Sequence, residues 1–126
     1  MRRTKRLLAV LLLATGLSAH TWIAPPIARA LGWGAIAISP ATGNVGYSQN
    51  LYSALVAEQA AIAVCNAFDC QAVVHFSSAC GAVAQEAVNL SWGWGWDYSI
   101  IGAQNQALAG CSQFGAGCRV IGWTCS

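Results

Sequence analysis

The fold is decided by Ser53-Ala-Leu-Val-Ala-Glu-Gln-Ala-Ala-Ile-Ala-Val-Cys65 and by a second stretch of the same kind, Ser99-Ile-Ile-Gly-Ala-Gln-Asn-Gln-Ala-Leu-Ala-Gly-Cys111. Each begins with a serine that can cap a helix, carries alanines along one helical face, and ends in cysteine. In both cases a second cysteine, Cys70 or Cys118, opens an apolar run typical of a β-strand. We therefore predict a helix followed by a strand, twice, with alanine faces small enough for each helix to lie close to a sheet.

A longer repeat surrounds these two stretches. Gly34-Ala-Ile-Ala37 has a counterpart in Gly81-Ala-Val-Ala84, and Gly46-Tyr47 has one in Gly93-Trp94, each 47 positions later. The serine-to-cysteine stretches are offset by 46, so the change of one residue falls in the loop between strand and helix. Two tandem units therefore account for nearly all of the chain after its N-terminal segment.

The residues before each helix have the pattern of β-strands. From Trp33 the side chains alternate, with Ile36 and Ile38 on one face and alanines on the other. After a turn that contains proline and glycine, the chain returns as a second strand. The predicted fold is α+β, with two tandem strand-strand-helix-strand repeats at about residues 33–79 and 80–126. We expect a largely antiparallel sheet with both helices on one face, stapled by disulfides.

The first thirty residues have the pattern of a secretory signal peptide. Four basic residues lie within residues 2–6, an apolar run covers residues 7–17, and Ala28-Arg29-Ala30 matches the A-x-A cleavage pattern. The apolar run is too short to span a bilayer. We expect residues 1–30 to be removed, and residues 31–126 to form a single domain that is secreted to the outside or to the cell envelope, without a membrane anchor.

Removal of that segment reverses the charge of the protein. The full chain has a formal net charge of +2, but Arg119 is the single basic residue after position 30. It stands against four acidic residues, which gives residues 31–126 a formal net charge of −3; these are Glu58, Asp69, Glu86 and Asp97. A domain with one basic residue has no electrostatic footprint for phosphate backbones, so nucleic acid and anionic membranes are not expected partners.

All six cysteines lie after the signal segment, at positions 65, 70, 80, 111, 118 and 125. An even number in a short exported chain is typical of a disulfide framework. The spacings differ from the Cys-x2-Cys pairs of structural zinc sites, so no metal is expected. Six cysteines allow fifteen connectivities, and the simplest one that respects the repeat is Cys65–Cys70, Cys111–Cys118 and Cys80–Cys125.

On these residues the chain resembles a known family. The run Gly-Ala-Ile-Ala-x-Ser-Pro from Gly34, the alanine-rich helix ending in Cys65, the element Cys80-Gly-Ala-Val-Ala84 and the terminal Trp123-x-Cys125 are similar to DUF4189. This is a family of small exported bacterial proteins, and the resemblance covers Trp33 to the C-terminus. It implies export and fold, and it implies no catalytic residues, because the family has no assigned activity.

The sequence holds few candidates for catalysis. His75 lies mid-strand where the second unit has Trp123, so we interpret it as a packing position. An enzyme hypothesis would use Glu86 and Asp97, on either side of the aromatic strand, as the carboxylate pair of a small hydrolase acting on envelope polysaccharide. Asp97 also precedes the predicted helix cap at Ser99, where a carboxylate is favourable without any catalytic role. We expect no enzyme activity, no cofactor and no metal.

The strongest indication of binding is Ser91-Trp-Gly-Trp-Gly-Trp-Asp-Tyr98. In a strand, Trp92, Trp94, Trp96 and Tyr98 project to one face, and two glycines leave the other face bare. If the aromatic face is exposed, it is a flat platform for sugar rings or for an apolar partner surface. If it is covered, it is half of the hydrophobic core, which the small size of the domain favours.

From the sequence we expect a secreted, disulfide-bonded protein that acts as a non-enzymatic binding or interaction module. Its partner would be a protein or a glycan, contacted through the tryptophan-rich strand. Two other hypotheses stay open at this stage. One is the envelope hydrolase described above, and the other is a secreted inhibitor or effector that binds a foreign protein.

Overall fold

The computed structural model describes residues 32–126, so the predicted signal peptide and its cleavage site lie outside the described residues. Within them the order strand, strand, helix, strand occurs twice. The elements are β1 (Trp33–Ile38), β2 (Val45–Leu51), α1 (Ala54–Cys65), β3 (Gln71–Ser77), β4 (Cys80–Glu86), β5 (Trp92–Asp97), α2 (Ile100–Ser112) and β6 (Cys118–Cys125). We call β1 to β3 with α1 the first unit, and β4 to β6 with α2 the second unit.

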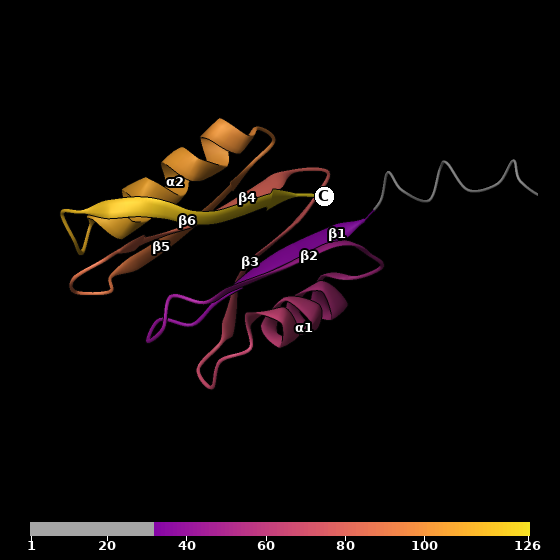
Figure 1. Cartoon of the computed structure of the whole chain (residues 1–126). Coiled ribbons are helices and arrows are strands. Elements are labelled where there is room, and N and C mark those ends of the chain that lie inside the picture. The colour runs from indigo at the N-terminus through magenta and orange to yellow at the C-terminus, as the bar shows by residue number, and fades with distance from the viewer. Residues whose placement is uncertain (1–31) are drawn as a thin grey trace, which may run out of the picture.

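Two three-stranded sheets form the centre of the molecule, with strand orders β2-β1-β3 and β5-β4-β6. Every pairing in them is antiparallel. The elements form four layers: α1 covers the outer face of the first sheet, α2 covers the outer face of the second, and the two sheets face each other (Figure 1). The predicted α+β class and the antiparallel pairing are confirmed.

The layering differs from the expected single sheet with both helices on one face. The reason is that β1 has two apolar faces. Ala35 and Ala37 pack against α1, whereas Ile36 and Ile38 alternate with them and are also fully buried. A single sheet with both helices on one side would leave the two isoleucines in water, at a cost of about 2 kcal/mol each. A second sheet over that face buries them.

Each helix lies very close to its sheet because only small residues separate them. A β-carbon built on Gly46 of β2 would stand 2.0 Å from the carbonyl oxygen of Ala61 in α1. In the second unit, a β-carbon on Gly93 of β5 would stand 2.1 Å from the amide nitrogen of Cys111 in α2. The alanine faces of the helices therefore meet backbone, as the sequence pattern indicates.

Serine caps fix the start of both helices. The hydroxyl oxygen of Ser53 accepts a hydrogen bond from the amide of Val56 at 3.1 Å, and that of Ser99 accepts one from the amide of Gly102 at 3.0 Å. Each bond satisfies one of the backbone N–H groups that a helix start leaves unpaired. The helix starts predicted from these serines are confirmed.

The space between the two sheets is filled by a compact core with one aromatic ring at its centre. Phe76 of β3 lies against Gly34 of β1 and Gly81 of β4, where added β-carbons would stand 2.7 Å and 2.4 Å from the ring. This ring therefore contacts both sheets at once. The buried residues of this cluster are Ile36, Val74, Phe76, Ala79 and Val83.

Three disulfides connect the elements, in the same three pairs that the repeat predicts. Cys65–Cys70 and Cys111–Cys118 each join the end of a helix to the strand that follows. Cys80–Cys125 links β4 to β6 at directly paired positions. Within residues 32–126 every cysteine is used. Such a framework indicates an oxidising, non-cytoplasmic compartment.

Candidate functional site

The aromatic face of β5 points to solvent. Trp94 is 47% exposed, Trp96 is 43% exposed and Tyr98 is 77% exposed, while Trp92 is half-buried. Trp96 and Tyr98 pack edge to face, with ring centroids 5.6 Å apart. The interpretation of this face as half of the core is therefore wrong for Trp94, Trp96 and Tyr98.

The opposite face of β5 explains why the tryptophans stay outside. Gly93 and Gly95 lie directly against the backbone of α2, with added β-carbons at 2.1 Å from the amide nitrogen of Cys111 and 2.7 Å from the carbonyl oxygen of Ala103. This leaves no space for a side chain between the strand and the helix. Because side chains alternate along a strand, the tryptophans must occupy the other face.

Three adjoining hollows run along this aromatic face. The largest has a volume of about 990 Å³ and the other two have about 310 Å³ each. The first two meet at Trp94, and the second and third meet at Trp96 and His75. We call the three together the aromatic groove. The residues used below are Trp92, Trp94 and Trp96 from β5, Tyr98 just after it, His75 from β3, Glu58 from α1, Asp69 from the α1–β3 loop, and Trp33 from β1.

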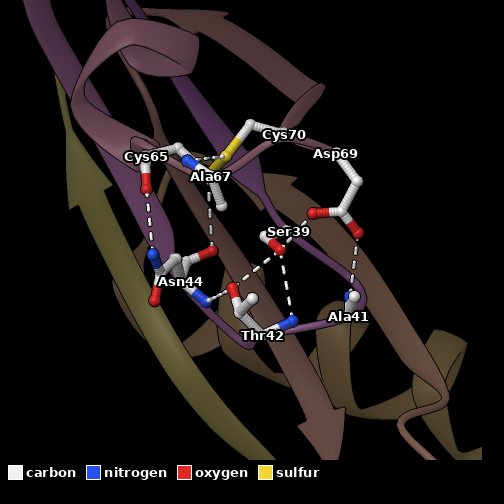
Figure 2. The surroundings of a disulfide bond; sticks show 8 residues. All are labelled: Ser39, Ala41, Thr42, Asn44, Cys65, Ala67, Asp69 and Cys70. Carbon is white, nitrogen blue, oxygen red and sulfur yellow. Dashed lines mark hydrogen bonds between the residues drawn. A yellow bond between two sulfur atoms is a disulfide. The ribbon is translucent and has the colours of Figure 1, made fainter.

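A carboxylate forms one wall of the largest hollow. Asp69 accepts hydrogen bonds from the hydroxyl of Ser39 and, at 3.0 Å, from the amide of Ala41 (Figure 2). Ser39 in turn accepts hydrogen bonds from the amide and the hydroxyl of Thr42, at 3.2 Å and 2.7 Å. The Ser39 hydroxyl, followed by the Ala41 amide, holds the pKa of the Asp69 carboxyl below its usual range. This carboxylate therefore keeps its negative charge at neutral pH.

A histidine–carboxylate pair lines the second hollow. Nδ1 of His75 lies 2.7 Å from Oε1 of Glu58, and both side chains are partly exposed. The imidazole also packs edge to face with Trp33, with ring centroids 5.7 Å apart. His75 was expected to be a packing position, and it does pack on Trp33. Its polar partner is Glu58, for which the sequence predicted no role in a site.

The groove is built by both units together. β3 is the edge strand of the first sheet and β5 is the edge strand of the second, and their side chains line the same hollow. The other two edge strands, β2 and β6, form a hollow of about 390 Å³ on the opposite side. Each unit therefore contributes one strand to each side of the molecule.

The strand registers align the two sides residue by residue. Ile36 and Val83 occupy the same position in the two central strands. Ile36 pairs with Tyr47 and Val74, and Val83 pairs with Trp94 and Gly122. By register, Trp94 then corresponds to Tyr47 and His75 to Trp123 on the opposite side, and by the helix repeat Glu58 corresponds to Gln104. At the place of Trp96, β2 has a bulge that contains Gln49. The acidic residue and the tryptophan pair are thus specific to one side.

The carboxylate pair suggested for a hydrolase lies too far apart. Asp97 pairs with Cys80 at one end of β4, whereas Glu86 is at the other end of that strand. Six residue steps separate them, which is about 20 Å, whereas glycosidase carboxylates lie about 5–10 Å apart. Glu86 instead accepts the amide of Asn89 at 2.6 Å in the β4–β5 turn. Asp97 accepts the hydroxyl and the amide of Ser99, and these bonds lower its pKa.

The described residues offer no alternative centre for metal chemistry. Between residues 32 and 126, His, Cys, Asp and Glu side chains do not gather in groups of three or more that could hold an ion. In the same region, the two helices are too short and not apolar enough to cross a membrane. The site is therefore defined by aromatic area and negative charge.

Comparison with known proteins gives a family and one structural relative. The model of a family described as a domain of unknown function (DUF4189) matches residues 33–125. The chain is also similar to the NMR structure of Rv1813c from Mycobacterium tuberculosis, with a TM-score of 0.56 and 28% sequence identity over 75% of each chain. No curated protein matches the sequence.

Proposed function

Because this chain belongs to the DUF4189 family, whose function is unknown, we propose its role from its own surface: it is a binding module that acts outside the cytoplasm through the aromatic groove. The observation that carries this proposal is the exposure of Trp94 and Trp96 on a strand whose other face is closed by α2. Large aromatic side chains that are held partly in solvent by the scaffold, and that line adjoining hollows, are typical of binding surfaces.

The proposed location follows from two features. The three disulfides require an oxidising compartment, and the N-terminal segment has the pattern of a signal peptide. Secretion to the cell envelope or beyond would satisfy both. A secreted inhibitor or effector would use the same groove and would differ only in the origin of its partner.

A binding role without catalysis is supported by the state of the reactive groups. In residues 32–126 all cysteines are disulfide-bonded. Glu86 lies at one end of β4, and Asp97 of β5 is paired with the other end of that strand. Glu58 and His75 pair with each other, and among the described residues the hollow that they line together has no serine, threonine or cysteine in its lining. We therefore propose that the groove recognises its partner without changing it.

The test follows the indole N–H signals of the five tryptophans in residues 31–126 by NMR while glycans and peptides are added to the oxidised protein. Ligand binding should shift the signals of Trp94 and Trp96 first. The paired substitution Trp94→Ala and Trp96→Ala should abolish the binding, whereas Trp123→Ala should not. Trp123 is a matched control because it is 46% exposed and lies on the opposite side. Shifts confined to Trp123, or no shifts with ligands of either class, would refute the proposal.

A further inference from the structure

We infer that the aromatic groove recognises an extended, basic segment of polypeptide, with lysine or arginine side chains lying on its tryptophans. This inference rests on the proposed function, because it names the class of partner for the same groove. It is carried by two properties of the groove: the spacing of its aromatic residues and the sign of its charge.

The spacing fits an extended peptide. Trp92, Trp94 and Trp96 are alternate residues of β5, and Tyr98 follows at the same interval just after the strand, so these residues recur about every 6.7 Å along the backbone. Alternate side chains of an extended peptide have the same spacing. The distance from Trp92 to Tyr98 is about 20 Å, which matches about six residues of extended chain. Each second side chain of such a peptide can therefore meet one ring.

The charge of the groove selects cations. Asp69 lines the first hollow and Glu58 lines the second, and Trp94 lies in both. No lysine or arginine lines any of the three hollows, because Arg119, the single basic residue of the described chain, lies on β6. A cation on the face of Trp94 would thus have a carboxylate in the lining of whichever of the two hollows it occupies. Tryptophan is the best aromatic partner for a cation, and nearby carboxylates add Coulomb attraction.

The opposite side of the molecule, at β2 and β6, has a similar backbone but lacks the acidic residue of the groove. There Gln104 stands in the place of Glu58, and a bulged part of β2 that contains Gln49 takes the place of the regular strand at Trp96. Both units share a bulge, at Ile36/Ala37 in the first and at Val83/Ala84 in the second. A carboxylate at the position of Glu58 is therefore not needed to build the fold, which supports a role in recognition.

The experiment compares three probes of matched length by isothermal calorimetry and indole N–H NMR at pH 8. They are a capped (Lys-Thr)₃ peptide, a capped (Glu-Thr)₃ peptide and the neutral hexamer of N-acetylglucosamine. The basic peptide should bind and shift Trp94 and Trp96, and the acidic peptide should not. Each tryptophan-to-alanine change should weaken binding about two- to fivefold. Glu58→Gln and Asp69→Asn should each weaken it by a similar factor, with the largest effect at low salt.

Asp97→Asn is the matched control for charge. It removes one negative charge from a partly exposed carboxylate that accepts hydrogen bonds from Ser99, the N-cap of α2, on the face of β5 away from the tryptophans. Binding of the basic peptide should stay unchanged in this variant. If the basic peptide binds equally well to Asp69→Asn, Asp97→Asn and the tryptophan variants, its binding is unspecific and the inference fails. If the sugar hexamer shifts Trp94 and Trp96 and the basic peptide does not, the inference fails while the proposed binding function stands.

Discussion

Gly93 in β5 lies directly under Cys111 in α2, so close that a β-carbon on the glycine would stand 2.1 Å from the cysteine amide nitrogen. The aromatic groove depends on this contact. It closes one face of β5 and forces every large side chain of that strand to the other face. The exposed tryptophans are thus a consequence of backbone packing on the hidden side of the strand.

Gly93→Ala should destabilise the protein strongly. Its methyl group would also overlap the carbonyl oxygen of Ala107 at 2.6 Å, so α2 would have to move away from the sheet. We expect a loss of about 3 kcal/mol in the free energy of unfolding, measured by urea denaturation. Gly110→Ala is the control, since its β-carbon would meet Gly93 at an ordinary 3.5 Å. Alanine favours a helix by up to about 1 kcal/mol, so this variant should be neutral or more stable.

Phe76→Ala should remove the central contact between the two sheets. The side chain is 3% exposed and touches both central strands at Gly34 and Gly81. Its loss leaves a cavity, because these two glycines have no side chains that could fill the space. We expect a decrease of about 3–5 kcal/mol in the free energy of unfolding. Phe68→Ala removes the same group from a side chain that is 90% exposed, and it should change stability by less than about 0.5 kcal/mol. Equal effects of the two variants would contradict the two-sheet core.

The three disulfides should differ in their contribution to stability. Cys80–Cys125 closes a loop with a sequence separation of 45, whereas Cys65–Cys70 closes one with a separation of 5. On the chain-entropy model the long loop contributes about 4 kcal/mol and the short one about 2 kcal/mol. Replacing each pair by alanines and measuring chemical denaturation would test this order. A larger loss from the Cys65–Cys70 pair would show that local structure outweighs loop entropy here.

Acid should weaken the network around Asp69. Its pKa is lowered in the folded protein from 3.8, first by the Ser39 hydroxyl, so its contribution is fully present above that value. The contribution is lost as the pH falls through the lowered pKa, because the protonated group loses these bonds. The difference in Tm between wild type and Asp69→Asn should therefore be largest above about pH 4 and shrink towards pH 2. Parallel curves of Tm against pH would exclude this role for the carboxylate.

Local features of the sequence were sufficient for much of the fold. Ser53 and Ser99 marked the helix starts, and the alternation after Trp33 marked the first strand. The family resemblance rested on the same local features. The pairing of the cysteines followed from comparing the two units. In each unit one cysteine ends the helix and its partner lies at the start of the next strand.

Other features needed the three-dimensional arrangement. The residues of β1 are apolar on both faces, with Ile36 and Ile38 on one and Ala35 and Ala37 on the other. A strand that is apolar on both faces is expected to be buried on both. The second sheet could have been predicted from it. The groove could not, because Glu58, Asp69 and Trp94 come from a helix, a loop and a strand that are far apart in sequence. Only the packing of the two sheets brings them together.

The scarcity of basic residues has a consequence for the resistance of the protein to proteases. Between residues 32 and 126, a protease that cleaves after lysine or arginine finds one susceptible bond, between Arg119 and Val120. This bond lies within β6, which is paired with β4 and tied by disulfides at Cys118 and Cys125. Cleavage requires a segment to leave its sheet and enter the protease as a flexible strand. The folded domain should therefore resist cleavage by proteases of trypsin specificity.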